Sequence, residues 1–257
     1  MPPRRLPDHP SGIGLRLDRT QLKYIAILAM LLDHVAFLFL APTSLEYQLF
    51  RFIGRCTGPI MAWFVAEGVY YTRNLDAYLR RLGIFALLSW PCYTLAFFGH
   101  LPLYRNAGAW TLDPTQGVIS CLFLGAMSVT YWEDRGRSKY ARMARVFLML
   151  LASIICDHAV VGVLWVLWFH CYKNDPAKKW GLYLVGVWFL FMQSWTGLET
   201  SWYMMGYVLA PLLLSRYDGT PGRGDRWFFY LFYPGHLLIL GAIRDFLAMR
   251  IMTGVSP

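Results

Sequence analysis

Charged residues are scarce in this 257-residue chain and make up 15% of it. An average soluble domain carries about 25% charged residues. Hydrophobic residues make up 57% of the chain, and its mean hydropathy is +0.39. The apolar runs also lack the strict alternation of a transmembrane β-barrel. Together these absences argue against a soluble enzyme and favour an α-helical membrane protein.

Sequence motifs of metal sites and of several common enzyme mechanisms are missing. The chain has five cysteines, all within or beside apolar runs, but no Cys-x-x-Cys pair. We therefore expect neither a zinc site nor a disulfide framework, and no metal cofactor. Gly-x-Ser-x-Gly, His-Glu-x-x-His and Walker motifs do not occur either, so the common hydrolase, metalloprotease and NTPase mechanisms have no sequence support.

Acidic residues are fewer than basic ones, and the formal net charge is +9. Such a balance occurs in nucleic-acid-binding proteins, but in a membrane protein Lys and Arg collect in the cytoplasmic loops. We favour this second explanation and predict no nucleic-acid partner. Residues 1–21 contain several prolines and basic residues, which predicts a flexible basic cytoplasmic tail rather than a cleaved signal.

Residues 22–257 are predicted to form a single membrane-embedded domain. A membrane-spanning helix needs about 20 mostly apolar residues. On this basis the sequence predicts an all-α, polytopic transmembrane bundle of about nine spans, with short or re-entrant helices around 144–172. The expected spans are 22–41, 51–71, 82–99, 116–132, 144–156, 159–172, 180–196, 201–215 and 227–243.

The distribution of basic residues predicts the orientation. If the N-terminus is cytoplasmic, 19 of the 24 Lys and Arg fall on the cytoplasmic side. The predicted outer loops then hold only Arg105, Arg244 and Arg250, while Arg51 and Arg55 lie at or inside a span. This asymmetry predicts a multi-pass protein with a cytoplasmic N-terminus and an outer C-terminus.

Two segments allow more than one interpretation. The apolar pieces at 144–156 and 159–172 are short for full crossings, and one long helix through both would reverse the topology after it. We favour two short helices with Asp157 and His158 at their outer tip, because broken spans often mark binding sites. Residues 73–81 are expected to form a surface helix.

Ionisable groups at membrane depth are costly and usually face a bundle interior or a cavity. The first such place is Asp33 and His34, which adjoin in the first predicted span. Adjacent side chains point about 100° apart on a helix, so the two need different partners. Lys23 lies on the same face as His34, about 16 Å earlier along the helix. Lys23 is equally well explained as an interfacial anchor and His34 as a helix–helix hydrogen bond.

The second place is the pair Arg51 and Arg55, which lie four residues apart and share a helix face. Because guanidinium stays charged, two of them at one depth need anionic partners such as Asp33, Asp157 or a ligand. The simpler alternative, an anchor at the outer interface, fits Arg51 better than Arg55. The nearby Pro59 is expected to kink the helix.

Three further places complete the candidate set. Glu67 lies nearer the cytoplasm and is explained equally well as a buried neutral carboxylic acid. Asp157 and His158 occupy the predicted tip, and His236 follows a Pro-Gly pair in the last span. A single membrane histidine is usually structural, but several histidines together with two Arg and two Asp favour a functional site.

Histidine beside fixed positive charge suits acyl transfer. The imidazole accepts the proton of an incoming amine or hydroxyl, and an arginine stabilises the developing oxyanion. We predict His34 as the general base, with Asp33 turned aside to hold Arg51 or Arg55, or the imidazole of His236. Lys23, with Arg80 and Arg81, is predicted to bind the phosphates of coenzyme A at the cytoplasmic mouth. Arg51 is a further predicted cofactor-binding residue. A non-enzymatic transporter or docking scaffold is the alternative.

Five stretches follow one another in the sequence: LKYIAILAMLLDHVAFLF, RFIGRCTGPIMAWFVAEGVYYTRN, YLRRLGIFALLSWPCY, CDHAVVGVLW and FYPGHLLILGAIR. Together they resemble the TraX family, whose namesake is a conjugative pilin acetylase. A more distant similarity links the chain to membrane acyltransferases that carry a basic residue eleven positions before a first-span histidine. That residue is commonly Arg, whereas this chain has Lys23.

The resemblance implies a membrane-embedded acetyltransferase of the bacterial inner membrane that uses acetyl-CoA as co-substrate. It implies an acceptor amine, such as the N-terminus of a pilin subunit, or another cell-envelope molecule. The matching motifs would supply Asp33, His34, Arg55 and Asp157 to the catalytic centre, with Glu67, His158 and His236 as further candidates.

Overall fold

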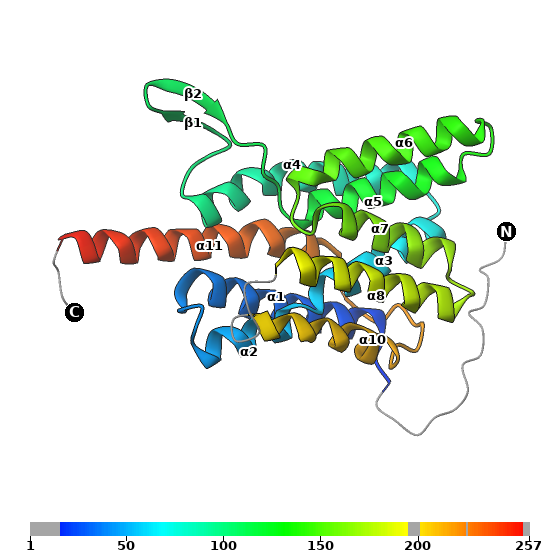
Figure 1. Ribbon diagram of the computed structural model, residues 1–257, viewed down its shortest axis with the longest axis horizontal. Helices are drawn as coiled ribbons and strands as arrows, with labels where there is room; N and C mark the ends of the chain where they lie inside the picture. The colour runs from blue at the N-terminus through cyan, green and yellow to red at the C-terminus, as the bar shows by residue number, and fades with distance from the viewer. Residues whose placement is uncertain (1–15, 195–200, 225, 254–257) are drawn as a thin grey trace.

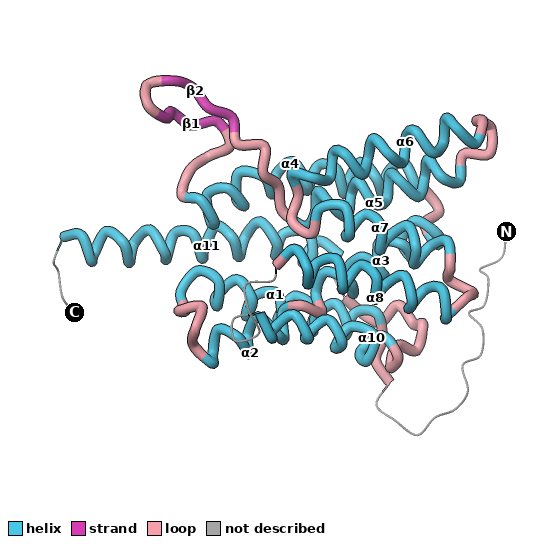
Figure 2. Tube along the Cα trace, viewed as in Figure 1, coloured by secondary structure: helices cyan, strands magenta, loops and turns pink. Residues whose placement is uncertain are grey.

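The computed structural model describes residues 16–194, 201–224 and 226–253. The chain folds into a bundle whose helices run broadly along one axis (Figure 1). Strands occur only in a small hairpin that projects from one end of the bundle, within the described residues (Figure 2). The predicted all-α class is therefore confirmed, with this hairpin as an unpredicted addition. The predicted tail lies mostly in residues 1–15, outside the described residues.

The elements follow the apolar runs of the sequence. They are α1 (Arg19–Phe39), α2 (Leu45–Gly54), α3 (Thr57–Tyr71), α4 (Leu75–Phe98), β1 (Leu103–Asn106), β2 (Ala109–Leu112), α5 (Val118–Glu133), α6 (Lys139–Ala152), η1 (Ser153–Ile155), α7 (Ala159–Cys171), α8 (Pro176–Gln193), η2 (Trp202–Val208), α10 (Leu209–Leu214) and α11 (Arg226–Thr253). The central helix is α3, which contacts α1, α4, α5, α7 and α10.

Local sequence signals explain several helix ends. Asp18 and Gln21 form a capping box in which each side chain accepts from the other's backbone N–H, at 2.8 and 2.9 Å. These bonds satisfy two of the free N–H groups at a helix start. As a result α1 begins at Arg19, three residues before the predicted span. A different signal ends α4: Gly99 follows its last residue and adopts the left-handed conformation, with φ 77°.

The segment predicted as one kinked span, 51–71, consists of α2 and α3. The helical pattern is interrupted at Arg55 and Cys56. Pro59 lies three residues into α3 and has no N–H to bond the carbonyl four residues earlier, which belongs to Arg55. The interruption therefore lies where the proline removes a helical hydrogen bond, and it places Arg55 at the junction of the two helices.

Other predictions need correction. Residues 73–81 do not form a separate surface helix, because all but the first two belong to the start of α4. Arg244 and Arg250, predicted in an outer terminal segment, lie inside α11, which continues to Thr253. The region 144–172 contains two helices, α6 and α7, separated by η1 and the tip at 156–158. The interpretation as one long helix is therefore wrong.

Two helices in the described residues are long and apolar enough to cross a membrane. These are α1 and α4, with mean hydropathies of 1.8 and 1.3 over their best windows. The helices Val118–Glu133, Ala159–Cys171 and Trp202–Leu214 are apolar but shorter. The fold thus supports membrane association through α1 and α4, while nine crossings stay a prediction.

Candidate functional site

Polar side chains from four parts of the chain meet in the half of the bundle that contains the end of α1. Asp33 and His34 come from α1, Arg51 and Arg55 from the end of α2, and His236 from α11. Asp157 and His158 form the tip between η1 and α7. Asp33, His34 and His236 are at most 8% exposed. Four of the five places singled out in the sequence therefore belong to one site.

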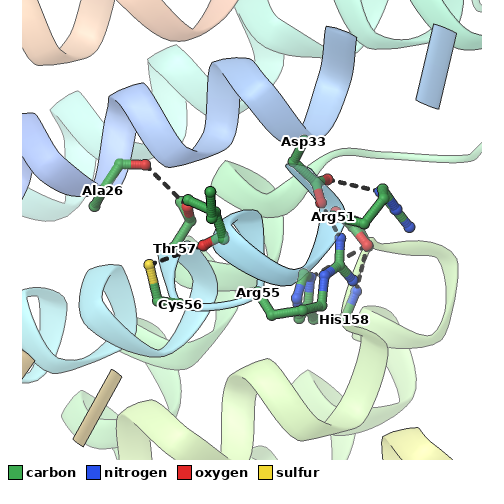
Figure 3. Close-up of polar contacts among 9 residues, drawn as sticks. Ala26, Asp33, Arg51, Arg55, Cys56, Thr57 and His158 are labelled. Atoms are coloured by element: carbon green, nitrogen blue, oxygen red, sulfur yellow. Dashed lines mark hydrogen bonds and ion pairs between the residues drawn. The ribbon is translucent and has the colours of Figure 1, made fainter. Parts of the chain in front are cut away.

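Asp33 joins the two arginines. Its Oδ2 accepts a hydrogen bond from Arg51 Nη1 at 2.7 Å, and its Oδ1 accepts one from Arg55 Nη2 at 2.6 Å (Figure 3). Such short charge-assisted bonds are among the strongest polar contacts in proteins. One carboxylate balances only one of the two positive charges. The Nε–H groups of both arginines are buried without a hydrogen-bond partner in the described structure, so donor capacity is left for a ligand.

The approach of α2 to α1 depends on a glycine. A Cβ atom on Gly54 would overlap the Asp33 side chain, with its Oδ1 2.5 Å away. Gly54 therefore allows the carboxylate to lie against the α2 backbone, between Arg51 and Arg55. Nearby, Thr57 Oγ1 donates to the Ala26 carbonyl at 2.9 Å and fixes the start of α3 against α1 (Figure 3).

His34 points to a different partner from Asp33, as expected for adjacent helical residues. Its Nδ1 lies 2.8 Å from Nε2 of His236. The two rings are nearly parallel, with an interplanar angle of 7°. Nδ1 of His236 in turn lies 2.8 Å from the Phe232 carbonyl oxygen, one turn earlier in α11. His236 thus bonds the imidazole of His34, whereas Asp33 holds both arginines and not His236.

The tip between η1 and α7 has an unusual backbone. His158 and Ala159 have positive φ angles of 60° and 34°. Non-glycine residues rarely adopt this region, and such strain concentrates at functional sites. Backbone bonds hold the tip in place: Gln116 N–H donates to the Ile155 carbonyl, and Asp157 N–H donates to the Gln116 carbonyl, both at 2.8 Å.

Asp157 belongs to the site but pairs with neither arginine within the described residues. Its Oδ1 accepts a bond from the His158 backbone N–H at 2.9 Å and lies 3.2 Å from the His158 ring Nδ1. The Asp157 side chain is 41% exposed, although it lies among packed helices. This exposure reflects its position in the wall of a cavity.

Two cavities meet at Arg55, Asp157 and His158. The larger has a volume of about 350 Å³ and is also lined by Arg51, Tyr203 and Tyr207. The smaller, of about 30 Å³, is lined by Asp33, His34, Gly54 and Gly58, among others. Typical ligand sites measure about 300–1,000 Å³. The larger cavity therefore has room for a small reactive group, and the smaller one lies between it and His34.

Sequence reasoning missed the tyrosines of this wall. The Tyr203 ring lies 5.2 Å from Arg51 Cζ and 5.6 Å from Arg55 Cζ, and the Tyr207 ring lies 5.9 Å from Arg55 Cζ. Aromatic faces attract cations at such distances. The four-residue spacing of Tyr203 and Tyr207 was the available signal, but it is common in apolar runs.

The remaining carboxylate candidate, Glu67, lies in a separate cluster near the start of α1. Its Oε2 accepts from Arg19 Nη2 at 3.0 Å and from the Tyr217 hydroxyl at 3.1 Å. Neither Arg19 nor Tyr217 was predicted to contact it. Glu67 is thus an ion-paired residue that joins α1, α3 and the segment after α10, and it lines neither cavity.

Lys23 and His34 both lie against α11, in agreement with the prediction that they share one face of α1. The Lys23 ammonium lies 5.3 Å from the Phe229 ring centroid in α11 and 5.7 Å from the Phe64 centroid in α3. Within the described residues Lys23 makes no ion pair. Arg80 is exposed and Arg81 partly buried, and none of the three lines either cavity. In the described part of the chain, no three His, Cys, Asp or Glu side chains form a metal-binding group.

Comparison with known proteins assigns the family. The family model described as "TraX protein" matches residues 18–244, which include every candidate residue from Lys23 to His236. The chain belongs to the TraX family. It is also 32% identical over 237 residues to the probable fimbrial assembly protein FimC, serogroup H1, of Dichelobacter nodosus. That alignment covers 88% of this chain and 96% of the relative. No solved structure matches the chain.

The range matched by the TraX family model includes the residues of the candidate site. Asp33, the Arg51–Arg55 pair, the 156–158 tip and His236 all lie inside residues 18–244. The resemblance to the TraX family is therefore confirmed, and the name of the relative connects that relative with fimbrial assembly.

Proposed function

We propose that this TraX-family chain is an integral membrane acetyltransferase that moves an acetyl group from acetyl-CoA to an acceptor amine. One observation carries the proposal: His34 and Arg55 line the same small cavity, and Asp33 balances only half of the charge of Arg55 and Arg51. An acyl transfer needs this combination of a base and a stabilised oxyanion.

The reaction assigns a role to each group. The acceptor nitrogen attacks the thioester carbonyl carbon, His34 takes the proton from that nitrogen, and Arg55 with Arg51 stabilises the oxyanion. When the intermediate collapses, the carbon–sulfur bond breaks, the proton passes to the coenzyme A sulfur, and the acetyl amide is left on the acceptor. Asp33 holds the arginines in place. The carboxylate of Asp157 attracts the cationic amine, which releases one proton to solvent so that its neutral form attacks.

The acceptor we propose is the N-terminal amine of a pilin subunit. The relative from Dichelobacter nodosus, named as a probable fimbrial assembly protein, supports an acceptor of this class. The 350 Å³ cavity favours a narrow, flexible end of a polypeptide over a folded surface. Because two helices among the described residues are long enough to span a bilayer, a membrane-anchored pilin precursor and the enzyme would share one membrane.

The coenzyme is proposed to enter from the opposite end of the bundle, with its phosphates near Lys23. The Lys23 ammonium is flanked by Phe64 and Phe229 and has no carboxylate within ion-pair distance among the described residues. A half-buried cation without a counter-ion suits a phosphate. Arg80 and Arg81, at the start of α4, are proposed to add positive charge at this mouth.

We propose a bacterial inner-membrane location, several crossings and a cytoplasmic N-terminus. The proposal is supported by contacts between segments predicted on the same side. The N–H groups of Leu17 and Arg19 donate to the carbonyls of Arg216 and Thr220, each at 2.9 Å. At the opposite end, Arg244 donates to the carbonyls of Leu95 and Ala96.

The deciding experiment is an acetyl-transfer assay with the purified full-length chain in detergent and radiolabelled acetyl-CoA. A peptide with a free N-terminus is the acceptor, and the same peptide with a blocked N-terminus is the control. We expect label on the free peptide only, and none with the His34→Ala variant. A folded wild-type chain that transfers no label to any amine would overturn the proposal in favour of a scaffold or transporter.

A further inference from the structure

Two hydrogen bonds connect the Phe232 carbonyl, the His236 ring and the His34 ring in series. The Phe232 oxygen lies 2.8 Å from Nδ1 of His236. A carbonyl oxygen has no proton to give, so Nδ1 of His236 must be the donor. A neutral imidazole carries only one proton, and therefore its other nitrogen, Nε2, can only accept.

The same reasoning extends one residue further. Nε2 of His236 lies 2.8 Å from Nδ1 of His34. Since Nε2 of a neutral His236 is an acceptor, Nδ1 of His34 must donate and must carry the His34 proton. Nε2 of a neutral His34 is then left with an unshared electron pair. The small cavity that His34 lines with Asp33, Arg55 and Asp157 is the space available to that nitrogen.

Packing keeps both rings in this arrangement. The Phe232 ring stacks on His236, with ring centroids 4.9 Å apart and an interplanar angle of 15°. On the other side, the Phe97 ring meets His34 edge-on at 5.2 Å and 83°. Both histidines are at most 8% exposed, so water does not readily replace either bond.

We propose that His236 is a positioning residue that fixes the tautomer of His34, so that the basic nitrogen of His34 is Nε2 and faces the cavity. The inference rests on the proposed acetyl transfer, in which His34 receives a proton from the acceptor. In that step the proton binds Nε2 of His34, and the new positive charge spreads through the Nδ1–H bond to His236 and its Phe232 carbonyl contact. Without His236, the proton of neutral His34 is free to occupy Nε2, and Nε2 then cannot accept the proton of the acceptor amine.

The first test measures the tautomer without any activity. Full-length protein labelled with ¹⁵N-histidine is reconstituted in lipid nanodiscs at a pH where histidine is neutral, and the His34 signals are identified by their loss in His34→Gln. We expect an Nδ1–H tautomer in wild type. His236→Leu, which removes the acceptor, shifts His34 toward Nε2–H. His236→Gln, whose amide oxygen can accept, keeps Nδ1–H, as does the control His100→Gln in the loop after α4.

The second test measures rates over a range of acetyl-CoA concentrations up to saturation. General-base catalysis contributes about 10²–10⁴-fold, so His236→Leu should lower kcat by about 10²-fold, leave the KM for acetyl-CoA unchanged, and be largely rescued by His236→Gln. An Nε2–H tautomer in wild type would overturn the inference, as would an unchanged kcat in His236→Leu. A wild-type chain that transfers no acetyl would overturn the proposed function instead, and the tautomer measurement would still decide the arrangement of the two histidines.

Discussion

Asp33 and Arg55 face each other across the contact of α1 with α2, with Oδ1 and Nη2 2.6 Å apart. The Asp33 side chain is 10% exposed and also binds Arg51. Removing one partner of a buried ion pair leaves the other charge without compensation, which costs about 3–5 kcal/mol. Among the described residues, the two arginines therefore depend on the carboxylate of Asp33.

The first prediction concerns that carboxylate. Asp33→Asn keeps the shape of the side chain but removes its charge and leaves Arg51 and Arg55 uncompensated. We expect the free energy of unfolding in detergent to fall by about 3–5 kcal/mol, together with loss of acetyl transfer. The matched control is Asp76→Asn, at an exposed position of α4, which should leave both unchanged. Equal free energies of unfolding for Asp33→Asn and Asp76→Asn would contradict the structural role of Asp33.

The second prediction separates charge from geometry. Arg55→Lys keeps the positive charge but replaces the planar guanidinium by a compact ammonium, which cannot provide directed bonds to Asp33 and to a ligand at once. We expect the lysine variant to fold and yet to lose most acetyl transfer. Arg105→Lys, at an exposed residue of β1, is the control. A fully active Arg55→Lys chain would make Arg55 an interfacial anchor.

Much of this site follows from the sequence because the cost of burying charge is independent of fold. Asp33, Arg51 and Arg55 each needed an opposite charge, and their pairing is the simplest arrangement in which these charges can be buried. The shared face of Lys23 and His34 follows equally directly from helix geometry. Contacts that involve Tyr203, Tyr207, Arg19 and Tyr217 depend on tertiary packing between segments far apart in the chain, and no local pattern encodes them.

The same distinction applies to the fold. Apolar runs predict where helices lie, but the capping box of Asp18 and Gln21 and the continuation of α4 across residues 75–81 depend on short polar signals. The β1–β2 hairpin turns at Ala107 and Gly108, which have positive φ angles of 49° and 85°. Its strands are four residues each, too short for a clear alternating pattern.

The third prediction uses the close approach at Gly54. A methyl group there would overlap the Asp33 side chain, so Gly54→Ala must push α2 away from α1 and weaken both arginine bonds. Overpacking of this kind costs about 1–3 kcal/mol. Gly181→Ala is the control, because a Cβ at that helical position meets nothing within 4 Å and alanine favours helices. The measured free energy of unfolding should fall for Gly54→Ala but not for Gly181→Ala. An equal change in both variants would contradict the role assigned to Gly54.

The fourth prediction tests the coenzyme end. Lys23→Ala removes the ammonium between Phe64 and Phe229 and should weaken coenzyme A binding while sparing the histidine site. A charge-assisted hydrogen bond is worth about 1.5–3 kcal/mol, which corresponds to roughly 10–150-fold in affinity. Calorimetry with coenzyme A measures the change. Lys178→Ala is the control, because Lys178 is already paired with Asp175 at 3.0 Å. Unchanged affinity in Lys23→Ala would move the phosphate site elsewhere.

The last prediction returns to Asp33 and His34, adjacent in sequence but with separate partners. Asp33 bonds Arg51 and Arg55, whereas His34 bonds His236. His34→Ala leaves the arginine–aspartate contacts intact, so we expect the variant to remain folded and to bind coenzyme A with unchanged affinity. Acetyl transfer should nevertheless fall by at least the roughly 10²–10⁴-fold that a general base contributes.

Three measurements on the same preparation separate catalysis from structure: acetyl transfer, a thermal melt and coenzyme A calorimetry. His100→Ala is the matched control, since His100 stacks on Tyr104 outside the site. Loss of transfer with a normal melt and normal affinity is the outcome expected of a base. If transfer stays near normal, His34 serves only to join α1 to α11 through His236, and the base must be sought at His158, on the other side of the small cavity.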